Sequence, residues 1–363
     1  MKLTRKIVFV TALVALMLTA LLTGCGGKDY VGEVNVCSWG LYIDTDLITR
    51  FEEQTGIKVN YSTAESNEAL YSLLKTGGAE FDVVVPSDYM IARLISEGML
   101  AEVNYDNIPN YSLIGEQYKG LSYDPDNRYT VPYAWGTLGI IYNSTMVDGE
   151  ITDWSAMFDE KYADQVLMIR NCRDALAIAL MELGYDINTT DETQIREAYA
   201  LLCDAKSRGV YQMSVMDEVY DKMESGEAAI ATYYAGDYLT MLENNEDLRF
   251  VLPEEGSNWF VDAMCILKDA ANKENAEKWM NFICSTESSL ANMDFIWYAS
   301  PNIEALAQYP AYYEETYGEP LEQEILDIMV APDEVLARCD IYENLPQETL
   351  TLYNDLWIEL GIS

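Results

Sequence analysis

Between residues 33 and 100, short apolar segments alternate with segments that have one apolar helical face. This alternation constrains the fold more than any other feature. Extended segments are predicted at 33–37, 57–61 and 81–86. Helices are predicted after Asp44, from the Ser66-Asn67 cap, and through Ile91, Leu94, Ile95 and Leu100. The segment 81–86, FDVVVP, is almost continuously apolar, as expected for a parallel strand covered on both faces. The pattern therefore predicts an α/β lobe.

The rest of the chain predicts a second lobe. Extended segments are predicted at 131–141, 165–169, 228–233 and 260–267, with helical segments between them and up to the end. The chain is longer than one hydrophobic core usually supports, and it has no flexible linker. We therefore expect two crossings between lobes, near 131–137 and 258–265, which together form a hinge. The predicted lobes are 32–136 with 262–305, and 137–261 with 306–363.

The first residues read as an export signal. Lys2, Arg5 and Lys6 precede an apolar run that ends in Leu22-Thr23-Gly24-Cys25. The end of this run resembles a bacterial lipobox, which implies cleavage after residue 24 and lipidation of Cys25. Residues 1–24 are thus predicted to be a lipoprotein signal peptide and residues 25–31 a tether. The protein is then expected to lie outside the cytoplasm, anchored to the membrane by lipid. A permanent transmembrane anchor is disfavoured because the run is short for a bilayer.

Composition excludes several functions. The net charge is −39, and it becomes −42 without residues 1–24. Such a chain does not bind nucleic acid by charge, although it can attract cationic solutes. The absence of histidine excludes Ser-His-Asp and Cys-His catalysis and histidine zinc sites. The six cysteines besides Cys25 form no CxxC pair, so no cofactor or metal is predicted.

Several motifs together resemble one family. They are residues 38–42 (SWGLY), 51–59 (FEEQTGIKV), 62–68 (STAESNE), 82–87 (DVVVPS) and 131–137 (VPYAWGT). From about Glu33 onward, the chain resembles the spermidine/putrescine-binding proteins of bacterial ABC importers. The resemblance implies a two-lobed periplasmic-binding-protein fold of type II, with the ligand held in a cleft between lobes. It also implies a polyamine ligand, a membrane permease as partner, a monomeric receptor and no enzymatic activity.

A polyamine receptor needs carboxylates for the ammonium groups and aromatic faces along the methylenes. Phe260 and Asp262 lie two residues apart in an extended segment, so they share one face. Ser87 and Tyr89 follow the carboxyl end of a predicted strand, where ligands of open α/β sheets bind. For both pairs, the resemblance implies ligand contact.

The resemblance carries over to further residues. It implies that Trp39 and Tyr42 wall the slot, with Tyr234 in place of a family tryptophan. Asp237 could contact a second amine, or it could equally cap the helix that follows. The family has acids at the positions of Asn171 and Asp174, and the amide of Asn171 departs from a spermidine-like pattern. Either residue could instead serve the following helix as N-cap or first-turn acid. The remaining implied ligand residues are Tyr298 and, by a loose match, Glu343.

Three other functions stay open at this point. A ferric-ion receptor could use the pair Tyr233-Tyr234, although neighbouring residues of a strand point to opposite faces. A glycoside hydrolase needs only two carboxylates, which 61 acidic residues always permit. A purely adhesive surface protein would bind no small molecule. The sequence does not choose between putrescine and spermidine.

Overall fold

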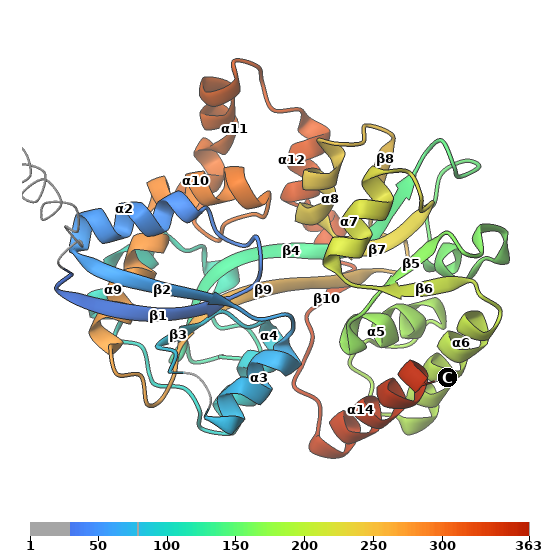
Figure 1. Ribbon diagram of the computed structural model, residues 1–363, viewed down its shortest axis with the longest axis horizontal. Helices are drawn as coiled ribbons and strands as arrows, with labels where there is room; N and C mark the ends of the chain where they lie inside the picture. Colours follow the sequence, from blue (N-terminus) through green and yellow to red (C-terminus); the bar gives the residue numbers. More distant parts are fainter. Residues whose placement is uncertain (1–29, 78–79, 363) are drawn as a thin grey trace, which may run out of the picture.

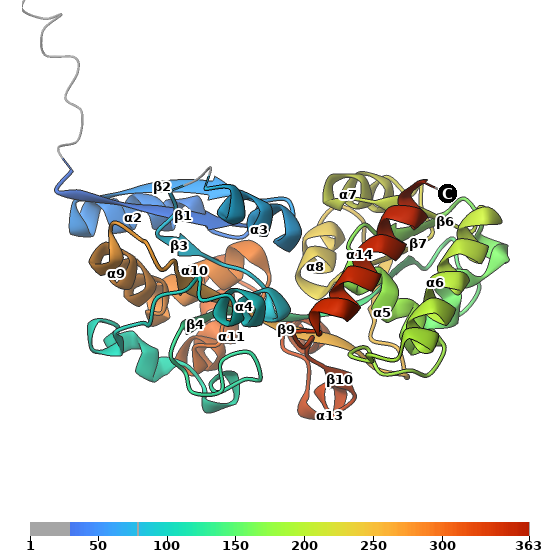
Figure 2. The ribbon, with the colours of Figure 1, turned by 90° about the horizontal axis from the view of Figure 1, so that it is seen from below.

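The computed structural model describes residues 30–77 and 80–362, and the strands of these residues form one sheet of ten strands. The strand order is β2-β1-β3-β9-β4-β7-β5-β6, with β10 beside β9 and β8 beside β4. Figure 2 shows the helices gathered in two groups, one on each side of the place where β4 and β9 pass between them. The predicted two-lobed α/β architecture is confirmed. The predicted signal peptide, its cleavage site and Cys25 lie outside the described residues.

The first lobe is built on parallel pairing of β1 with β2 and with β3. Short 3-10 helices at Tyr105–Asn107, Pro109–Leu113 and Glu116–Tyr118 also belong to this lobe, and the first two pack on α9. Its regular elements are β1 (Gly32–Ser38), α2 (Thr45–Thr55), β2 (Ile57–Thr63), α3 (Asn67–Thr76), β3 (Val83–Val84), α4 (Asp88–Ser96), α9 (Lys273–Ile283), α10 (Thr286–Ile296) and α11 (Ile303–Tyr317).

The second lobe is built on parallel pairing of β5 with β6 and with β7. Helix α14 (Gln347–Ile362) packs on α5 and α6, which returns the end of the chain to this lobe. The remaining elements are β5 (Val166–Ile169), α5 (Cys172–Glu182), α6 (Glu192–Ser207), β6 (Tyr211–Ser214), α7 (Met216–Glu224), β7 (Ile230–Tyr234), α8 (Ala235–Leu242), β8 (Leu248–Val251), α12 (Gln323–Met329), α13 (Asp333–Leu336) and β10 (Cys339–Asp340).

Two long strands connect the lobes (Figure 1). The first part of β4 (Thr130–Asn143) pairs antiparallel with β9 (Ser257–Ile266), and its last residues pair with β7 and β8. All fourteen residues of β4 are buried, which explains its unbroken apolar sequence. The glycines of β4 lie where a neighbouring aromatic side chain comes close to the backbone. A Cβ at Gly139 would lie 2.4 Å from the Phe250 ring.

Local signals set most element ends. Asp44 caps α2 by accepting a hydrogen bond from the Asp46 amide, and Ser66 caps α3 through the Ala69 amide. Gly56 ends α2 with φ 69°, a conformation that glycine adopts without strain. The helix predicted to include Leu100 was wrong at its end. Helix α4 stops at Ser96, and Leu100 instead forms a β-bridge with Leu267.

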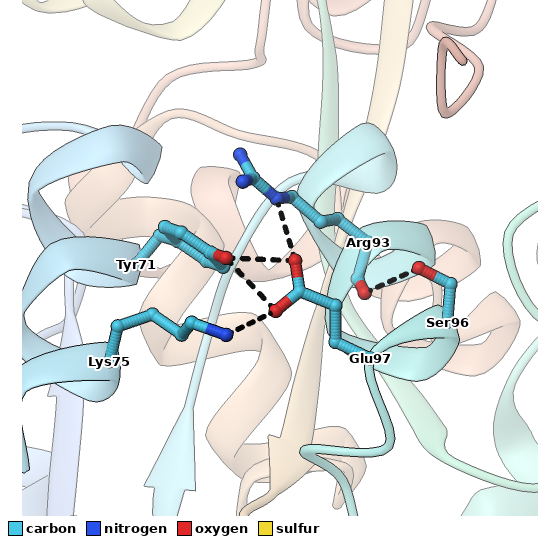
Figure 3. A network of polar contacts seen from close by, with 5 residues as sticks. All are labelled: Tyr71, Lys75, Arg93, Ser96 and Glu97. Carbon is cyan, nitrogen blue, oxygen red and sulfur yellow. Dashed lines mark hydrogen bonds and ion pairs between the residues drawn. The ribbon is translucent and has the colours of Figure 1, made fainter. Parts of the chain in front are cut away.

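A polar cluster joins α3 to α4 (Figure 3). The carboxylate of Glu97 accepts hydrogen bonds from Tyr71 at 2.8 and 2.9 Å, from Lys75 at 2.7 Å and from Arg93 at 3.1 Å. Arg93 also lies 3.7 Å from the centroid of the Tyr71 ring. Burial raises the pKa of Glu97, but these donors outweigh it and lower the pKa to about 2. The cluster holds α4, whose first turn carries residues of the candidate site.

The lobe limits predicted from sequence remain a prediction. Two of them, 136/137 and 261/262, fall within β4 and β9, as expected for crossings. At the third, 305/306, helix α11 runs on without a break and packs on α10. We therefore place the return of the chain to the second lobe after α11. Within residues 30–77 and 80–362, no helix is long and apolar enough to span a bilayer.

Candidate functional site

Three carboxylates lie where the lobes adjoin. Asp262 lies in β9, in register with Ala134 of β4, while Asp174 and Asp237 lie in the first turns of α5 and α8. Asp174 and Asp262 are 2% and 3% exposed, and Asp237 is partly buried. We call these residues the three-carboxylate site. A carboxylate removed from water requires hydrogen bonds and a compensating charge.

Asp262 accepts a hydrogen bond at 3.0 Å from Nε1 of Trp39, a residue that follows β1. Its other oxygen, Oδ1, makes no hydrogen bond of regular geometry with the described residues. The sequence placed Phe260 and Asp262 on one face of an extended segment, and β9 does span both. Trp39 and Asp262, which the sequence predicted as separate site residues, are in contact through the hydrogen bond described above.

Asp174 is held by two phenols of the second lobe. Tyr234 donates to Oδ2 at 2.7 Å, and Tyr342 donates to Oδ1 at 2.9 Å. Asn171 serves as N-cap of α5, since its side chain accepts hydrogen bonds from the amides of Arg173 and Asp174. Both oxygens of the Asp174 carboxylate are thus occupied by neutral donors, and the carboxylate is fixed in place.

Asp237 is held in the same way, but one of its two phenols comes from the first lobe. Tyr220 of α7 donates to Oδ1 at 2.8 Å, and Tyr298, which follows α10, donates to Oδ2 at 2.5 Å. Tyr298 reaches this position past Gly136 of β4 and Gly236 of α8. A Cβ at Gly236 would lie 2.3 Å from the Tyr298 ring, so only glycine leaves room for it.

Aromatic rings form a continuous wall beside these carboxylates. Tyr42 contacts Tyr298 with ring centroids 5.3 Å apart, and Tyr298 contacts Phe260 at 6.1 Å. Phe260 contacts Tyr234 at 5.3 Å, which carries the wall across to the second lobe. Such faces can cover methylene groups and attract a cation at the same time.

The site carries negative charge that the protein itself does not neutralise. In the part of the chain that the structure describes, no Lys or Arg forms an ion pair with Asp174, Asp237 or Asp262. Arg173 lies nearby, but its guanidinium lies 4.7 Å from the centroid of the Tyr342 ring and donates to Asn188 and to the Glu343 carbonyl. Its charge lowers the pKa of Asp174 without a direct contact.

Burial dominates the ionisation of all three acids. It raises the pKa of Asp174, Asp237 and Asp262 to about 6 each. The phenols oppose this effect at Asp174 and Asp237, and Ser87, Trp39 and Tyr42 oppose it at Asp262. A bound cation would favour the ionised forms and so lower these pKa values.

The other predicted residues lie at the edge of the site. Tyr89 donates to Glu68 at 3.0 Å, and its ring lies 6.2 Å from that of Tyr342. Ser87 precedes α4 and exchanges hydrogen bonds with Asn67. The side chain of Glu343 is exposed, and only its backbone takes part in contacts near the site. Glu343 as a ligand residue thus stays a prediction that no contact supports.

Sequence reasoning missed Tyr220, Tyr342 and Asp88. Tyr342 holds Asp174 from 168 residues away, so no local pattern links the two. Asp88, between the predicted Ser87 and Tyr89, is fully buried, although an acid in a first helical turn usually faces solvent. The only available signal was its place between two predicted site residues.

The ferric-ion alternative gains no support from the geometry. The Tyr234 hydroxyl donates to Asp174, and the rings of Tyr233 and Tyr234 touch at 5.1 Å. Because the two rings are in contact, these side chains do not point to opposite faces, contrary to the expectation. Among the residues that the structure describes, no group of three or more Cys, Asp or Glu is placed to hold a metal.

Known proteins are similar to this chain in fold and in sequence. Residues 46–316 match the family described as bacterial extracellular solute-binding protein. The chain is 33% identical to the spermidine/putrescine-binding periplasmic protein of Salmonella typhimurium, covering 74% of this chain and 77% of that one. It is 29% identical to spermidine/putrescine-binding periplasmic protein 1 of Haemophilus influenzae, covering 94% and 98%.

Solved structures agree with these matches. The spermidine/putrescine ABC transporter substrate-binding protein PotD from Streptococcus pneumoniae is 32% identical, with a TM-score of 0.76 over 91% of this chain and 99% of that one. A protein structure from Listeria monocytogenes is 35% identical, with a TM-score of 0.82 and the same coverage.

Two lobes joined by crossing strands, with charged and aromatic side chains buried between them, define a solute-binding protein. The length of the family match confirms this class rather than an enzyme. The chain belongs to the family of bacterial extracellular solute-binding proteins, in the group whose members are named spermidine/putrescine-binding proteins.

Proposed function

We propose that this protein captures a polyamine, putrescine or spermidine, outside the cytoplasm and delivers it to an ABC permease. The observation that carries the proposal is the negative charge of the buried Asp174 and Asp262 and of the partly buried Asp237, with no ion-pairing Lys or Arg among the described residues. The names of the relatives point to the same ligands.

The chemistry of a polyamine suits this arrangement. Its ammonium groups supply the positive charge that the carboxylates lack, and charge-assisted hydrogen bonds are about twice as strong as neutral ones. Its methylene groups can lie against the aromatic wall of Tyr42, Tyr298, Phe260 and Tyr234. Trp39 keeps the anchoring carboxylate of Asp262 oriented.

Ligand binding would favour the closed arrangement of the lobes. A polyamine that reaches Asp262 in β9 and Asp174 or Asp237 in the second lobe gains contacts only when the lobes are together. A ligand shifts a conformational equilibrium by its difference in affinity for the two states. The permease would then recognise the closed, loaded receptor.

A lipid anchor on Cys25 is the second part of the proposal. It rests on the lipobox-like residues 22–25. Incorporation of labelled fatty acid by the wild-type protein, and none by Cys25→Ala, would support the anchor. Equal labelling of both proteins would contradict it.

Calorimetric titration of the purified protein with putrescine and spermidine tests the ligand. We expect saturable binding of at least one polyamine and none of 1,4-butanediol, which has the same length as putrescine but no charge. Absence of both heat and thermal stabilisation with either polyamine, at about millimolar concentration, would overturn the proposal.

A further inference from the structure

A fourth carboxyl, Asp88, is buried next to the three-carboxylate site. It is the first residue of α4 and is 0% exposed. Its Oδ1 accepts a hydrogen bond from the Tyr89 amide at 2.6 Å, whereas its Oδ2 has no hydrogen-bond partner among the described residues. A buried polar atom without a partner is costly and calls for an explanation.

The backbone brings Asp88 close to Asp262. Helix α4 packs on β9, and the Ala263 amide donates a hydrogen bond to the Pro86 carbonyl at 3.4 Å. Ala263 directly follows Asp262, and Pro86 lies two residues before Asp88. The two carboxyls therefore belong to adjoining parts of the first lobe.

The four buried acids differ in how their oxygens are used. Asp174 and Asp237 each have a phenol on both oxygens. Among the described residues, Asp88 Oδ2 and Asp262 Oδ1 have no hydrogen bond of regular geometry, although the side chains of Ser87 and Tyr42 lie close enough to Asp262 to lower its pKa. A primary ammonium group has three N–H donors and requires several acceptors. The acceptors left without a regular hydrogen bond thus lie on the first lobe, whereas the carboxylates of the second lobe are already held by phenols.

The electrostatic surroundings of Asp88 are mainly negative. The pKa of Asp88 is raised to about 8, mainly by burial; the charges of Asp262 and Asp174 also raise it, while the Tyr89 amide and Arg173 lower it. Asp88 in turn helps to raise the pKa of two phenols. The titratable or charged groups that face it are Tyr89, Tyr123, Arg173, Asp174, Asp262 and Tyr342. Near neutral pH, Asp88 is therefore protonated until a further positive charge arrives.

We propose that Asp88 is a second anchoring carboxyl, paired with Asp262, for one primary ammonium group of the ligand, and that it loses its proton when this ammonium binds. The inference rests on the proposed polyamine function. The ammonium keeps its three hydrogens, the Asp88 carboxylic acid becomes a carboxylate, and one proton passes to the buffer. Asp88 then determines specificity by favouring a charged primary amine over a neutral group.

Titration of the wild-type protein with putrescine near pH 7, in phosphate and in Tris, tests proton release without any mutation. The two buffers have different ionisation enthalpies, so the difference in heat counts the protons. We expect release of about one proton per ligand, and an affinity that rises about tenfold from pH 6.5 to 8.5. Binding without proton release would overturn the role of Asp88 and leave the polyamine function standing. No binding of putrescine or spermidine would overturn both.

Asp88→Asn supplies the second test. It should weaken putrescine binding about tenfold at pH 8.5 but less than about threefold at pH 6.5, and its affinity should vary little with pH. The matched control is Asp46→Asn, which also removes an acid from a first helical turn of this lobe but on an exposed surface. Equal losses at both pH values would assign Asp88 a purely structural role and contradict the proposal.

Discussion

The Tyr298 hydroxyl donates a 2.5 Å hydrogen bond to Asp237, and this contact joins the two lobes through the candidate site. Tyr298 follows α10 of the first lobe, and Asp237 lies in the first turn of α8 of the second. The preceding residue strengthens the connection, because Nε1 of Trp297 donates to Glu243, the C-cap of α8, at 3.0 Å. Two consecutive side chains thus hold both ends of α8, and Trp297 adopts φ 57° to allow this.

Tyr298→Phe removes only the hydroxyl of this contact. We expect polyamine affinity to fall about tenfold to a hundredfold, through faster dissociation, because a hydrogen bond to a charged group contributes about 1.5–3 kcal/mol. Stopped-flow dissociation measurements would check it. Tyr309→Phe, which removes a hydroxyl 3.5 Å from Asp294 outside the site, is the control and should bind normally. An unchanged dissociation rate in Tyr298→Phe would contradict the role.

Asp262→Asn should change binding and stability in opposite directions. Loss of the anchoring charge should weaken polyamine binding tenfold or more, and Asp262→Ala should do at least the same. The unliganded protein should become more stable, because an uncompensated buried charge disappears. Calorimetric titration and thermal melting measure the two effects. Weaker binding together with a lower melting temperature would indicate a folding defect instead.

The unliganded protein should lose stability as pH rises from about 4 to 6. Burial raises the pKa of Asp174 and Asp262 from 3.8 to about 6, so in this range the folded chain binds more protons than the unfolded chain. Stability therefore falls with rising pH, by up to about 3 kcal/mol for each of these acids. The contribution of these two acids levels off above pH 6, whereas Asp88, with a pKa of about 8, extends the fall to about pH 8.

Chemical denaturation across this range measures the effect. The double variant Asp174→Asn/Asp262→Asn should show a shallower pH dependence, which separates these two acids from the general surface charge. Stabilisation by a polyamine should be larger at pH 7.5 than at pH 4.5. An identical slope in wild type and variant would show that these pKa values are not raised.

Gly236→Ala should disturb the site through packing alone. The added Cβ would lie 2.3 Å from the Tyr298 ring, so the ring must move away from Asp237. We expect a loss of about 1–3 kcal/mol in unfolding free energy, as is usual for overpacked sites, with weaker polyamine binding. Gly361→Ala in α14 has no atom within 4 Å of the added Cβ and is the matched control. Normal stability and affinity in Gly236→Ala would contradict the packing argument.

Glu97→Gln should lower stability without changing the affinity for polyamine. The folded pKa of Glu97 is depressed from 4.5 to about 2, so its stabilising contacts are present above pH 4.5 and are lost as pH falls toward 2. At pH 7 we expect a loss of about 1–2 kcal/mol, since the side chain is about a quarter exposed. Urea denaturation is the measurement. A tenfold change in affinity would show that the cluster acts on the site.

Local patterns predicted the parts of this protein that depend on neighbouring residues. The apolar run 131–141 predicted the extended segment that became β4, and the two-residue spacing of Phe260 and Asp262 predicted part of the site. The run 81–86 overstated its strand, because only Val83 and Val84 pair. The chain then turns at Pro86 into α4, and Pro has no amide hydrogen to continue a ladder.

The partners that complete the site were beyond local patterns. Tyr342 reaches Asp174 only because the segment after α13 returns to α5, and Tyr220 reaches Asp237 through the packing of α7 on α8. Hydrogen bonds of this kind depend on tertiary contacts between segments that have no common periodicity. The resemblance to known receptors supplied Trp39 and Tyr298 but gave no sign of Asp88.

The passage of β4 and β9 between the lobes governs how the polypeptide can be divided. Strand β9 follows β8 in the chain, so the sheet of the first lobe can add β9 only after the second lobe up to β8 has been synthesised. A fragment that ends before residue 257 would leave β3 and β4 without their shared neighbour, exposing two strand edges that invite aggregation. No single cut of the chain separates the two lobes. Ribosomal synthesis must therefore be nearly complete before either lobe can complete its fold.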